Sequence, residues 1–333
     1  MTPKPSETGA ALLAVLLLVA VMASLCAVAL EKMTLAARTA SNAAALEQAR
    51  AFALGAESYA LLRVGDLTRL APDRTTLRGG WYGSPIRIPL PDGFASATVV
   101  DGGNCFNLNS VVQKADPYAK DDVPAVYASS SRGMGQLGGL LRTVGTAPSE
   151  SEHIAQSLGD WIDTDGTPNQ AGAEDNAYAN LPVPYRTPNT LMVDPSELRA
   201  VAGVTPLIFE AVRPWLCALP EAVASPINVN TLQPDQAPLL AMLLPGQLTL
   251  DNARNLIARR PPDGWASPSA FWAEPIVEPL NSAAEVKAQT VMKTRWFRLA
   301  LDVELTGAQM SEVALIDAGS MPARLVSRTW GQD

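Results

Sequence analysis

The stretch GAALLAVLLLVAVMASLCAVAL, residues Gly9–Leu30, decides the architecture of this 333-residue chain. Its 21 residues from Ala10 to Leu30 carry no charge, and this is about the length that a helix needs to cross the hydrocarbon of a bilayer. A secretory signal would have a shorter apolar core followed by a cleavage site of small residues. Here the small residue, Gly9, comes before the apolar run. The stretch therefore predicts a membrane helix that stays attached to the rest of the chain.

The helical pattern continues beyond this stretch. Apolar residues recur there at steps of three and four, the spacing of one helix face; they are Leu46, Ala49, Ala53, Ala56 and Ala60. Neither Gly nor Pro occurs in residues 10–54. We expect one long helix, with residues 10–30 in the membrane and residues 31–65 outside it as an amphipathic stalk that ends near Arg63 to Gly65. The simpler alternative is a signal anchor followed by a stalk.

The charge balance limits the partners of the soluble part. The chain has 25 Lys and Arg against 33 Asp and Glu, a formal net charge of −8 and a pI near 4.8. This balance opposes binding to phosphate backbones, so we expect no nucleic acid partner. Lys4 mildly favours a cytoplasmic position for the N-terminus. The length is sufficient for a membrane helix and two domains with cores of their own.

Cysteine usage predicts one disulfide. Of the three Cys residues, Cys26 lies in the apolar stretch, which leaves Cys105 and Cys217 as the soluble pair. In an oxidising compartment such a pair often bridges, and closing so long a loop contributes about 4–5 kcal/mol in the chain-entropy model. The alternative is two buried free thiols.

Strand signals occur at two places far apart in the chain. Residues 86–88 and 97–100 have alternating or β-branched character with a Pro-Asp-Gly turn between them, and they predict a hairpin. Residues 295–305, 312–316 and 324–327 predict three more antiparallel strands. Helix signals dominate in between. This order predicts an α+β fold, in which residues 66–104 and 293–333 form one domain and residues 105–292 are inserted as an α-helical domain.

Helix starts are marked at several positions of the predicted insertion. The clearest is at residues 194–197, where Asp, Pro, Ser and Glu supply an N-cap, a Pro at the first helical position and a Glu at the third. Further starts are expected at Ser149, Thr205, Asn230 and Thr249, and a helix from Asn281 to Met292. Residues 198–215 and 240–257 form a weak helix-turn-helix repeat. The second unit, with residues 227–231 before it, resembles the helix-hairpin-helix of DNA-binding proteins, but the acidic charge argues against DNA.

Five carboxylates fall within sixteen residues of the insertion, near Gly and Pro; they are Asp160, Asp163, Asp165, Glu174 and Asp175. Hard oxygen ligands on a bendable backbone suit Ca²⁺. The stretch is not an EF-hand, because with Asp165 and Gly166 at loop positions five and six the twelfth position is Gly172 instead of Glu. The residues alone leave two equal alternatives, a Ca²⁺ loop and a solvated acidic turn.

Few residues are available for catalysis. His153 is the sole histidine and the Cys residues are far apart, which disfavours zinc and leaves no Ser-His-Asp or Cys-His arrangement except one built on His153. The simpler interpretation of His153 is a surface position early in a helix. The string GMGQLG at residues 133–138 matches the dinucleotide fingerprint, but residues 123–127 before it are interrupted by Pro124 and predict no convincing strand. We expect no enzyme.

The N-terminal features together resemble those of type IV pilins and type II secretion pseudopilins. These proteins have a short leader ending in Gly, an apolar helix that becomes amphipathic, and then a strand-rich region. Most carry Glu at the fifth mature residue, whereas this chain, counted from Ala10, has Ala14. That departure, the size and the acidic loop resemble the K-type minor pseudopilins. The resemblance covers nearly the whole chain.

The resemblance implies a fold, a processing event and a ligand. The prepilin peptidase would remove residues 1–9 by cutting between Gly9 and Ala10. A pilin-like antiparallel sheet would carry the insertion as two SAM-like helical subdomains. The acidic loop, with the five carboxylates named above, would bind Ca²⁺.

The resemblance also implies a role without catalysis. The protein would sit in the inner membrane of a Gram-negative bacterium by a single span, with its soluble domains in the periplasm. There it would form the tip of the pseudopilus with the I-, J- and H-type minor pseudopilins and the major pseudopilin, and it would be needed for export across the outer membrane. Ala14 is compatible with a tip position. The alternative is a membrane-anchored periplasmic hydrolase that uses the acidic cluster.

Overall fold

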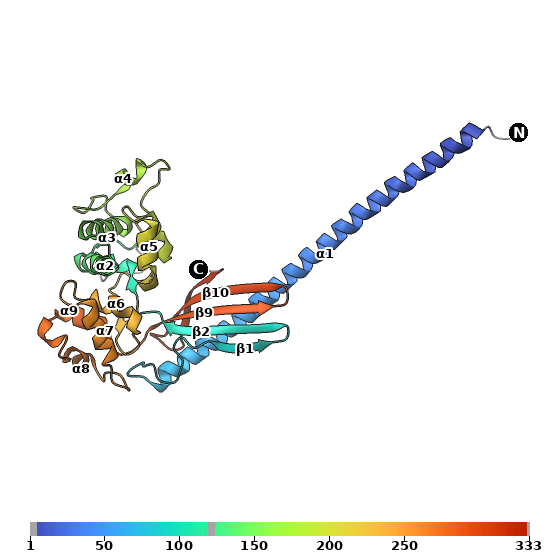
Figure 1. Cartoon of the computed structure of the whole chain (residues 1–333). Coiled ribbons are helices and arrows are strands. Elements are labelled where there is room, and N and C mark those ends of the chain that lie inside the picture. Colours follow the sequence, from blue (N-terminus) through green and yellow to red (C-terminus); the bar gives the residue numbers. More distant parts are fainter. Residues whose placement is uncertain (1–4, 117, 119–123, 332–333) are drawn as a thin grey trace.

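The architecture is a long helix, an antiparallel sheet packed along the end of that helix, and a helical head beside the sheet (Figure 1). The computed structural model describes residues 5–116, 118 and 124–331. Residues 1–4 of the predicted leader, including Lys4, and Val123 before the glycine string lie outside the described residues. The α+β fold expected from the sequence is confirmed.

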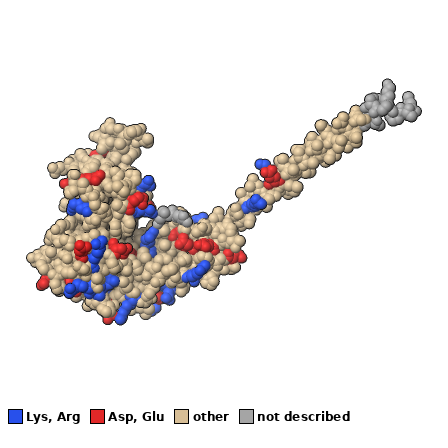
Figure 2. All heavy atoms as spheres, viewed as in Figure 1, with Lys and Arg blue, Asp and Glu red and all other residues tan. Residues whose placement is uncertain are grey.

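Helix α1 spans Pro5–Leu70 and is one continuous helix of 66 residues. It is the one described helix that is long and apolar enough to cross a membrane, with a hydropathy of 2.9 in its apolar window and no burial there. In Figure 2, the N-terminal half of the helix shows no Lys, Arg, Asp or Glu among the residues that are not drawn in grey, and the first charged residues appear about halfway along it. The other end of α1 packs against the sheet.

The C-terminal part of α1 buries one face; the buried residues are Ala49, Ala53, Ala56, Ala60 and Val64. Leu46, expected on this face, is exposed because the sheet ends before it. The predicted end near Gly65 was also wrong, since the helix runs to Leu70. Thr68, one turn beyond Val64, is buried and its Oγ1 lies 3.8 Å from Met321 Sδ. Tertiary packing therefore carries the helix through Gly65.

The sheet has five antiparallel strands; they are β1 (Ile86–Leu90), β2 (Gly93–Asp101), β9 (Trp296–Leu305), β10 (Ala308–Asp317) and β11 (Arg324–Trp330), in the order β1-β2-β9-β10-β11. The predicted hairpin is confirmed, with Leu90 opposite Gly93 at its turn. A Cβ at Gly93 would lie 1.8 Å from the carbonyl oxygen of Glu304, so only Gly allows β2 to approach β9 there. Leu299, Leu301 and Val303 alternate along β9 and face the core under α1.

The head comprises residues 106–291, which lie between β2 and β9 in sequence. Its first part contains β3 (Phe106–Asn107), η1 (Leu108–Val111), β4 (Val112–Lys114), β5 (Tyr127–Ser129), α2 (Ser131–Thr143), α3 (Pro148–Ile162), α4 (Asp175–Ala179), η2 (Pro195–Ala200), α5 (Pro206–Val212), η3 (Arg213–Trp215) and β6 (Leu216–Cys217). Its second part contains β7 (Ile227–Asn228), η4 (Pro234–Gln236), α6 (Ala237–Ala241), α7 (Leu250–Ala258), α8 (Pro268–Trp272), η5 (Glu278–Leu280), α9 (Ala284–Gln289) and β8 (Thr290–Val291). One hydrophobic cluster includes buried residues of both parts.

Three predicted helices differ in the structure. The capping box at Asp194 is present, but it opens the six-residue 3₁₀ helix η2. No helix starts at Asn230, because its side chain is buried and bonded to the backbone of Trp265. The last helix is short: Asn281 is left-handed with φ of 45°, and the chain turns into β8 after Gln289. The starts at Ser149, Thr205 and Thr249 are confirmed to within one residue.

The predicted disulfide is confirmed. Cys105 and Cys217 are bonded, with their Cα atoms 5.8 Å apart and a sequence separation of 112. The bond lies beside the parallel pairing of β3 with β6, in which Asn107 is opposite Cys217. It therefore joins the two ends of the first part of the head.

A buried polar network joins the head to the sheet; we call it the Asp101 network, and its members are Asp101, Asn104, Asn228, Thr231 and Thr294. Asp101 ends β2 and is 4% exposed. Its Oδ1 accepts from the backbone N–H groups of Gly103 and Asn104, at 2.9 and 3.3 Å. Its Oδ2 accepts from the hydroxyls of Thr231 and Thr294. One carboxylate thus contacts the exit from the sheet, the second part of the head and the return to β9.

Two asparagines complete the Asp101 network. Asn104 Nδ2 donates to the carbonyl of Asn228 at 3.2 Å, and the N–H of Asn228 donates to Asn104 Oδ1 at 2.8 Å. Asn228 Nδ2 donates in turn to Thr294 Oγ1 at 2.9 Å. Burial raises the pKa of Asp101, and the four hydrogen bonds to its carboxylate act in the opposite direction. Each polar group thereby has a partner, as a buried group requires.

Candidate metal centre

Three of the five predicted carboxylates lie together after helix α3. The helix ends at Ile162 and is capped by the extended residue Asp163, after which the chain forms a loop that returns before α4. Asp163, Asp165 and Glu174 each place one oxygen within 4.8 Å of the other two. Asp163 and Glu174 are buried, whereas Asp165 is exposed. The arrangement is a pocket of oxygens closed on two sides and open to solvent at Asp165.

Several carboxylate oxygens here are buried without any hydrogen bond. They are Asp160 Oδ2, Asp163 Oδ1 and Glu174 Oε1, on residues that are 0%, 2% and 7% exposed. Buried polar atoms normally have a partner, and an unpaired buried carboxylate oxygen is costly. These oxygens are hard, anionic ligands, the type that Ca²⁺ and Mg²⁺ prefer. The residues present therefore fit a divalent cation.

The other carboxylate oxygens of Asp163 and Asp160 accept hydrogen bonds from neutral donors. Ser129 Oγ donates to Asp163 Oδ2 at 2.8 Å. Asn169 donates to Asp160 Oδ1 through its Nδ2 at 2.5 Å and through its backbone N–H at 3.0 Å. Asn169 Nδ2 also donates to Ser129 Oγ at 2.8 Å, which links the two carboxylates. Sequence reasoning missed Ser129, since it is 34 positions from Asp163 and nothing in the local pattern marks it.

The electrostatics of the cluster disfavour ionisation of all its acids without a cation. Burial raises the pKa of Asp163 to about 6, and the charges of Asp165 and Asp160 add to this. Burial raises the pKa of Glu174 to about 7, with the charges of Asp160 and Asp163 next in size. Burial likewise raises the pKa of Asp160. A bound cation would remove this repulsion.

Asp160 lies beside the cluster and Asp175 does not. A Cβ at Gly172 would lie 1.8 Å from Asp160 Oδ2, so the loop passes directly over this carboxylate and only Gly fits. Asp175 was expected to be a ligand, but its side chain is not among the carboxylates whose oxygens converge. Its Oδ1 accepts from the N–H and the hydroxyl of Thr187, both at 2.9 Å, which lowers its pKa. Asp175 is the first residue of α4, and Glu174 is its N-cap.

His153 is half-buried instead of lying on the surface as expected. Its Nδ1 lies 2.6 Å from the carbonyl oxygen of Ala171, in the loop that returns to the carboxylates. A Cβ at Gly203 would lie 2.7 Å from the imidazole Cδ2, so the ring is also packed from the other side. His153 therefore fixes the position of the loop.

The glycine string at residues 133–138 lies inside helix α2 and serves packing. A Cβ at Gly133 would lie 1.9 Å from the carbonyl oxygen of Ser110 and one at Gly138 would lie 3.3 Å from Arg142, whereas one at Gly135 would meet no atom within 4 Å. A short strand, β5, does precede α2, which the sequence did not indicate. It pairs antiparallel with β4, so no βαβ unit surrounds the string.

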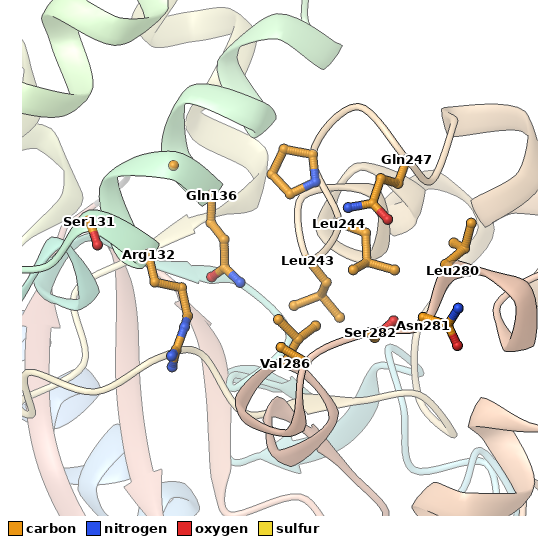
Figure 3. A pocket seen from close by; sticks show the side chains of 13 residues that line it. Ser131, Arg132, Gln136, Leu243, Leu244, Gln247, Leu280, Asn281, Ser282 and Val286 are labelled. Atoms are coloured by element: carbon orange, nitrogen blue, oxygen red, sulfur yellow. The ribbon is translucent and has the colours of Figure 1, made fainter.

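A pocket of about 460 Å³ lies where the two parts of the head meet (Figure 3). Apolar side chains of Leu243, Leu244, Leu280 and Val286 line it together with polar side chains from α2 and from Asn281 and Ser282. Among the described residues, no Asp, Glu or His lines this pocket. Its lining thus offers the hydroxyls of Ser131 and Ser282 without a carboxylate or imidazole to act as a general base.

The fold defines the class. An apolar N-terminal helix whose far end packs along an antiparallel sheet is the arrangement of a pilin-like subunit, and the inserted head makes this one unusually large. The sequence pattern of the family "Type II secretion system, protein K" matches residues 104–221 and again residues 227–292. The chain belongs to this family and is a minor pseudopilin of the type II secretion system.

Relatives and a solved structure support this assignment along the whole chain. Protein K of Pectobacterium carotovorum subsp. carotovorum is 33% identical over 328 residues, which cover 98% of this chain and 97% of the relative. Protein K of Klebsiella pneumoniae is 33% identical with the same coverage. The crystal structure of the GspK-GspI-GspJ complex from enterotoxigenic Escherichia coli contains a chain with a TM-score of 0.72 and 27% identity, covering 86% of this chain and 97% of that one. None of these similarities supports the hydrolase alternative.

Proposed function

We propose that this minor pseudopilin forms the tip of the periplasmic pseudopilus together with the I- and J-type minor pseudopilins, and that it is needed for export across the outer membrane. The observation that carries this proposal is the similarity to a chain of the GspK-GspI-GspJ complex over 86% of the present chain. The H-type minor pseudopilin and the major pseudopilin would follow below. The head is the broad part of the molecule and lies at the end of α1 opposite to the apolar segment (Figure 1).

Helix α1 supports this mode of assembly. Beyond the membrane-length segment, one face is buried against the sheet while apolar residues remain exposed on the others; these are Leu46, Leu54, Tyr59 and Leu62, between 37% and 70% exposed. Exposed apolar residues on several faces of one helix suit contacts with more than one neighbouring molecule. Neighbouring pseudopilin helices are the partners we infer for it.

We further infer that the protein is not an enzyme and that it sits in the inner membrane with the sheet and head in the periplasm. A single apolar helix of membrane length, among the described residues, supports the anchoring. The disulfide between Cys105 and Cys217 supports an oxidising compartment for the head. His153 is engaged in holding a loop, which supports a structural role for the acidic region.

We propose that the cation of the acidic cluster is Ca²⁺, held by Asp163, Asp165 and Glu174 with Asp160 beside them. Three unpaired buried oxygens and one exposed carboxylate suit a large cation that accepts irregular oxygen geometry and keeps some water. When bound, Ca²⁺ would supply positive charge and order the loop between α3 and α4. We leave Asp175, also expected from the sequence, out of this set because its Oδ1 accepts two hydrogen bonds from Thr187.

Removal of Ca²⁺ is expected to destabilise the protein. Ca²⁺ at a hundredfold excess over its dissociation constant adds about 2.7 kcal/mol to the free energy of unfolding if only the folded chain binds it. The melting temperature should therefore fall in excess chelator. Asp163→Asn and Glu174→Gln should abolish this Ca²⁺ dependence, whereas the control Asp175→Asn should keep it. A wild-type melting curve that is the same in Ca²⁺ and in chelator would contradict the site.

We propose that residues 1–9 are a leader removed between Gly9 and Ala10, as the small residue before the apolar segment suggests. N-terminal sequencing of the protein from cells with the prepilin peptidase should give Ala-Ala-Leu-Leu. Cells without the peptidase should yield the uncleaved chain. A mature start near Ala27, or an intact Met1 in the presence of the peptidase, is the result that would count against this proposal.

Ala14 supports the tip position. In pilin-like fibres the Glu at the fifth mature position neutralises the N-terminal amine of the subunit ahead, because a buried carboxylate needs a charge partner. A tip subunit has no subunit ahead of it. Alanine at this position avoids an unpaired charge, whereas a subunit in the shaft would lose a stabilising contact by lacking Glu. An alternative is that Ala14 only suits a bilayer helix.

Replacement of Ala14 tests the proposed function. Wild type co-expressed with the I- and J-type partners should purify as a complex with one copy of each, and it should restore export to cells lacking their own protein K. Ala14→Glu should form the complex and restore export no better than wild type, since at the tip no N-terminal amine of a subunit ahead is available to its carboxylate. Ala20→Ser, another substitution in the apolar segment, is the control and should behave as wild type. If Ala14→Glu enters the shaft and improves export, the tip position is wrong.

A further inference from the structure

Two buried glutamates meet where helix α1 packs on the sheet. Glu57 comes from α1 and is 5% exposed, and Glu312 comes from β10 and is 1% exposed. Arg328 of β11 lies beside both. This site lies where α1 meets the sheet and is separate from the acidic loop in the head.

The guanidinium of Arg328 contacts both acids, and its contacts with Glu57 are shorter than its contact with Glu312. Arg328 contacts Glu57 Oε2 with Nε at 2.7 Å and with Nη2 at 2.5 Å. Its Nε lies 3.3 Å from Glu312 Oε1. Both oxygens of Glu312 are buried without a hydrogen bond. The cluster thus contains two buried carboxyl groups and one positive charge, on an arginine whose side chain is 26% exposed.

The surrounding elements offer little further compensation. On β9, the residue opposite Glu312 is Leu301, and the neighbouring residues on the same face are also apolar. On β11, the residue opposite Glu312 is Trp330. Arg50 of α1 and Arg328 both lie 5.5 Å from the centroid of the Trp330 ring. In the described part of the chain, Glu57 and Arg328 are therefore the charged groups found to interact with Glu312, and Arg50 lies at the Trp330 ring.

We propose that Glu57 and Glu312 hold one proton between them in the folded protein, and that this proton makes the contact between α1 and the sheet dependent on pH. With the proton in place, Glu312 is neutral and Glu57 forms the ion pair with Arg328. When the proton is lost, two carboxylates share one guanidinium in a buried site. The contact between α1 and the sheet is then weaker.

The energetics agree with this geometry. Two carboxyl groups that share a buried site resist simultaneous ionisation, and they titrate as a pair. Burial raises the pKa of Glu312 to about 7; Glu57 adds to this rise and Arg328 opposes it. A pKa raised on folding means that the stabilisation is complete below the ordinary pKa of 4.5 and is lost as the pH rises through about 7. Mildly acidic conditions tighten the contact, and alkaline conditions loosen it.

The consequence concerns the connection of the head to the membrane segment. Helix α1 carries the membrane segment at one end and the sheet at the other (Figure 1). Glu57 is one of few polar residues on its buried face, amid Ala53, Ala56 and Ala60. A looser contact at Glu57 lets α1 move relative to the sheet and hence relative to the head.

Thermal unfolding of the full-length protein in detergent, with Ca²⁺ in constant excess from pH 5 to pH 8, tests the proposal. Glu312→Gln keeps the shape and removes the titration. As the pH rises from 5 to 8, the melting temperature of wild type should fall by several degrees relative to that of Glu312→Gln. Glu304→Gln, an exposed glutamate on β9, is the matched control and should follow wild type. A difference between wild type and Glu312→Gln that does not change with pH would overturn the proposal.

A second measurement does not depend on the folding of Glu312→Gln. Spin labels at Ser58→Cys on α1 and Ser327→Cys on β11, in a Cys26→Ser background, report the distance between helix and sheet. The distribution should broaden above about pH 7 in the otherwise wild-type chain and stay narrow when Glu57→Gln is added, because Glu312 then pairs with Arg328 alone. Equal distributions at pH 5 and pH 8 in the chain with both glutamates would overturn the proposal.

Discussion

The Asp101 carboxylate is the contact on which the arrangement of this molecule depends. The chain leaves the sheet for the head after β2 and returns to it at the neighbouring strand β9. Asp101 lies between these two points, at the end of β2 and beside Thr294, which precedes β9. Its other hydroxyl donor, Thr231, belongs to the second part of the head. Four hydrogen bonds to one buried carboxylate therefore fix the head on the sheet. The disulfide from Cys105 then closes the first part of the head only four residues away.

The described part of the chain contains three buried acidic sites, and each compensates its charge differently. Asp101 is compensated by four neutral donors. Asp163 and Glu174 have too few donors, and their unpaired oxygens suit a cation. Glu57 and Glu312 have one guanidinium for two acids, and the remaining charge is removed by a proton. The physical requirement, that a buried charge be paired, is the same in all three. Fixed donors give permanent structure, whereas a cation or a proton makes structure conditional.

Much of the fold could be predicted because the deciding signals are local. The apolar stretch, the hairpin turn at Pro91 to Gly93 and the caps at Thr205 and Thr249 act within a few residues of themselves, and the structure contains each of them. The helix predicted at Asn230 does not form because a distant partner decides this position: Asn230 is held by Trp265, which is 35 positions away. The helix predicted from Asn281 starts later, because Asn281 itself is left-handed. The predicted end of α1 was wrong because of another distant partner. Packing near Met321 stabilises the helix beyond Gly65, although glycine has a low helix propensity.

The candidate site shows the same division. The cluster of carboxylates was visible as a run of acidic residues, but which of them converge depends on the loop. Asp175 is adjacent to Glu174 in sequence and yet faces Thr187, while Ser129 comes from another strand. The Glu57 and Glu312 pair could not be seen at all, because 255 positions (312 minus 57) separate two residues that only the packing of α1 on β10 brings together. Local chemistry is readable from the sequence, and long-range pairing of polar groups is not.

The measurement that tests this account most directly compares the stability of Asp101→Asn with that of Asp302→Asn by urea unfolding of the full-length protein. Both changes remove one carboxylate from the same sheet, but Asp302 is exposed and accepts from Ser311 at the surface. Asp101→Asn should lower the free energy of unfolding by about 3 kcal/mol or more, since at least two hydrogen bonds to a charged group are lost at about 1.5–3 kcal/mol each. Asp302→Asn should change it by about 0.5 kcal/mol or less. Equal effects of the two substitutions would contradict the central role of Asp101.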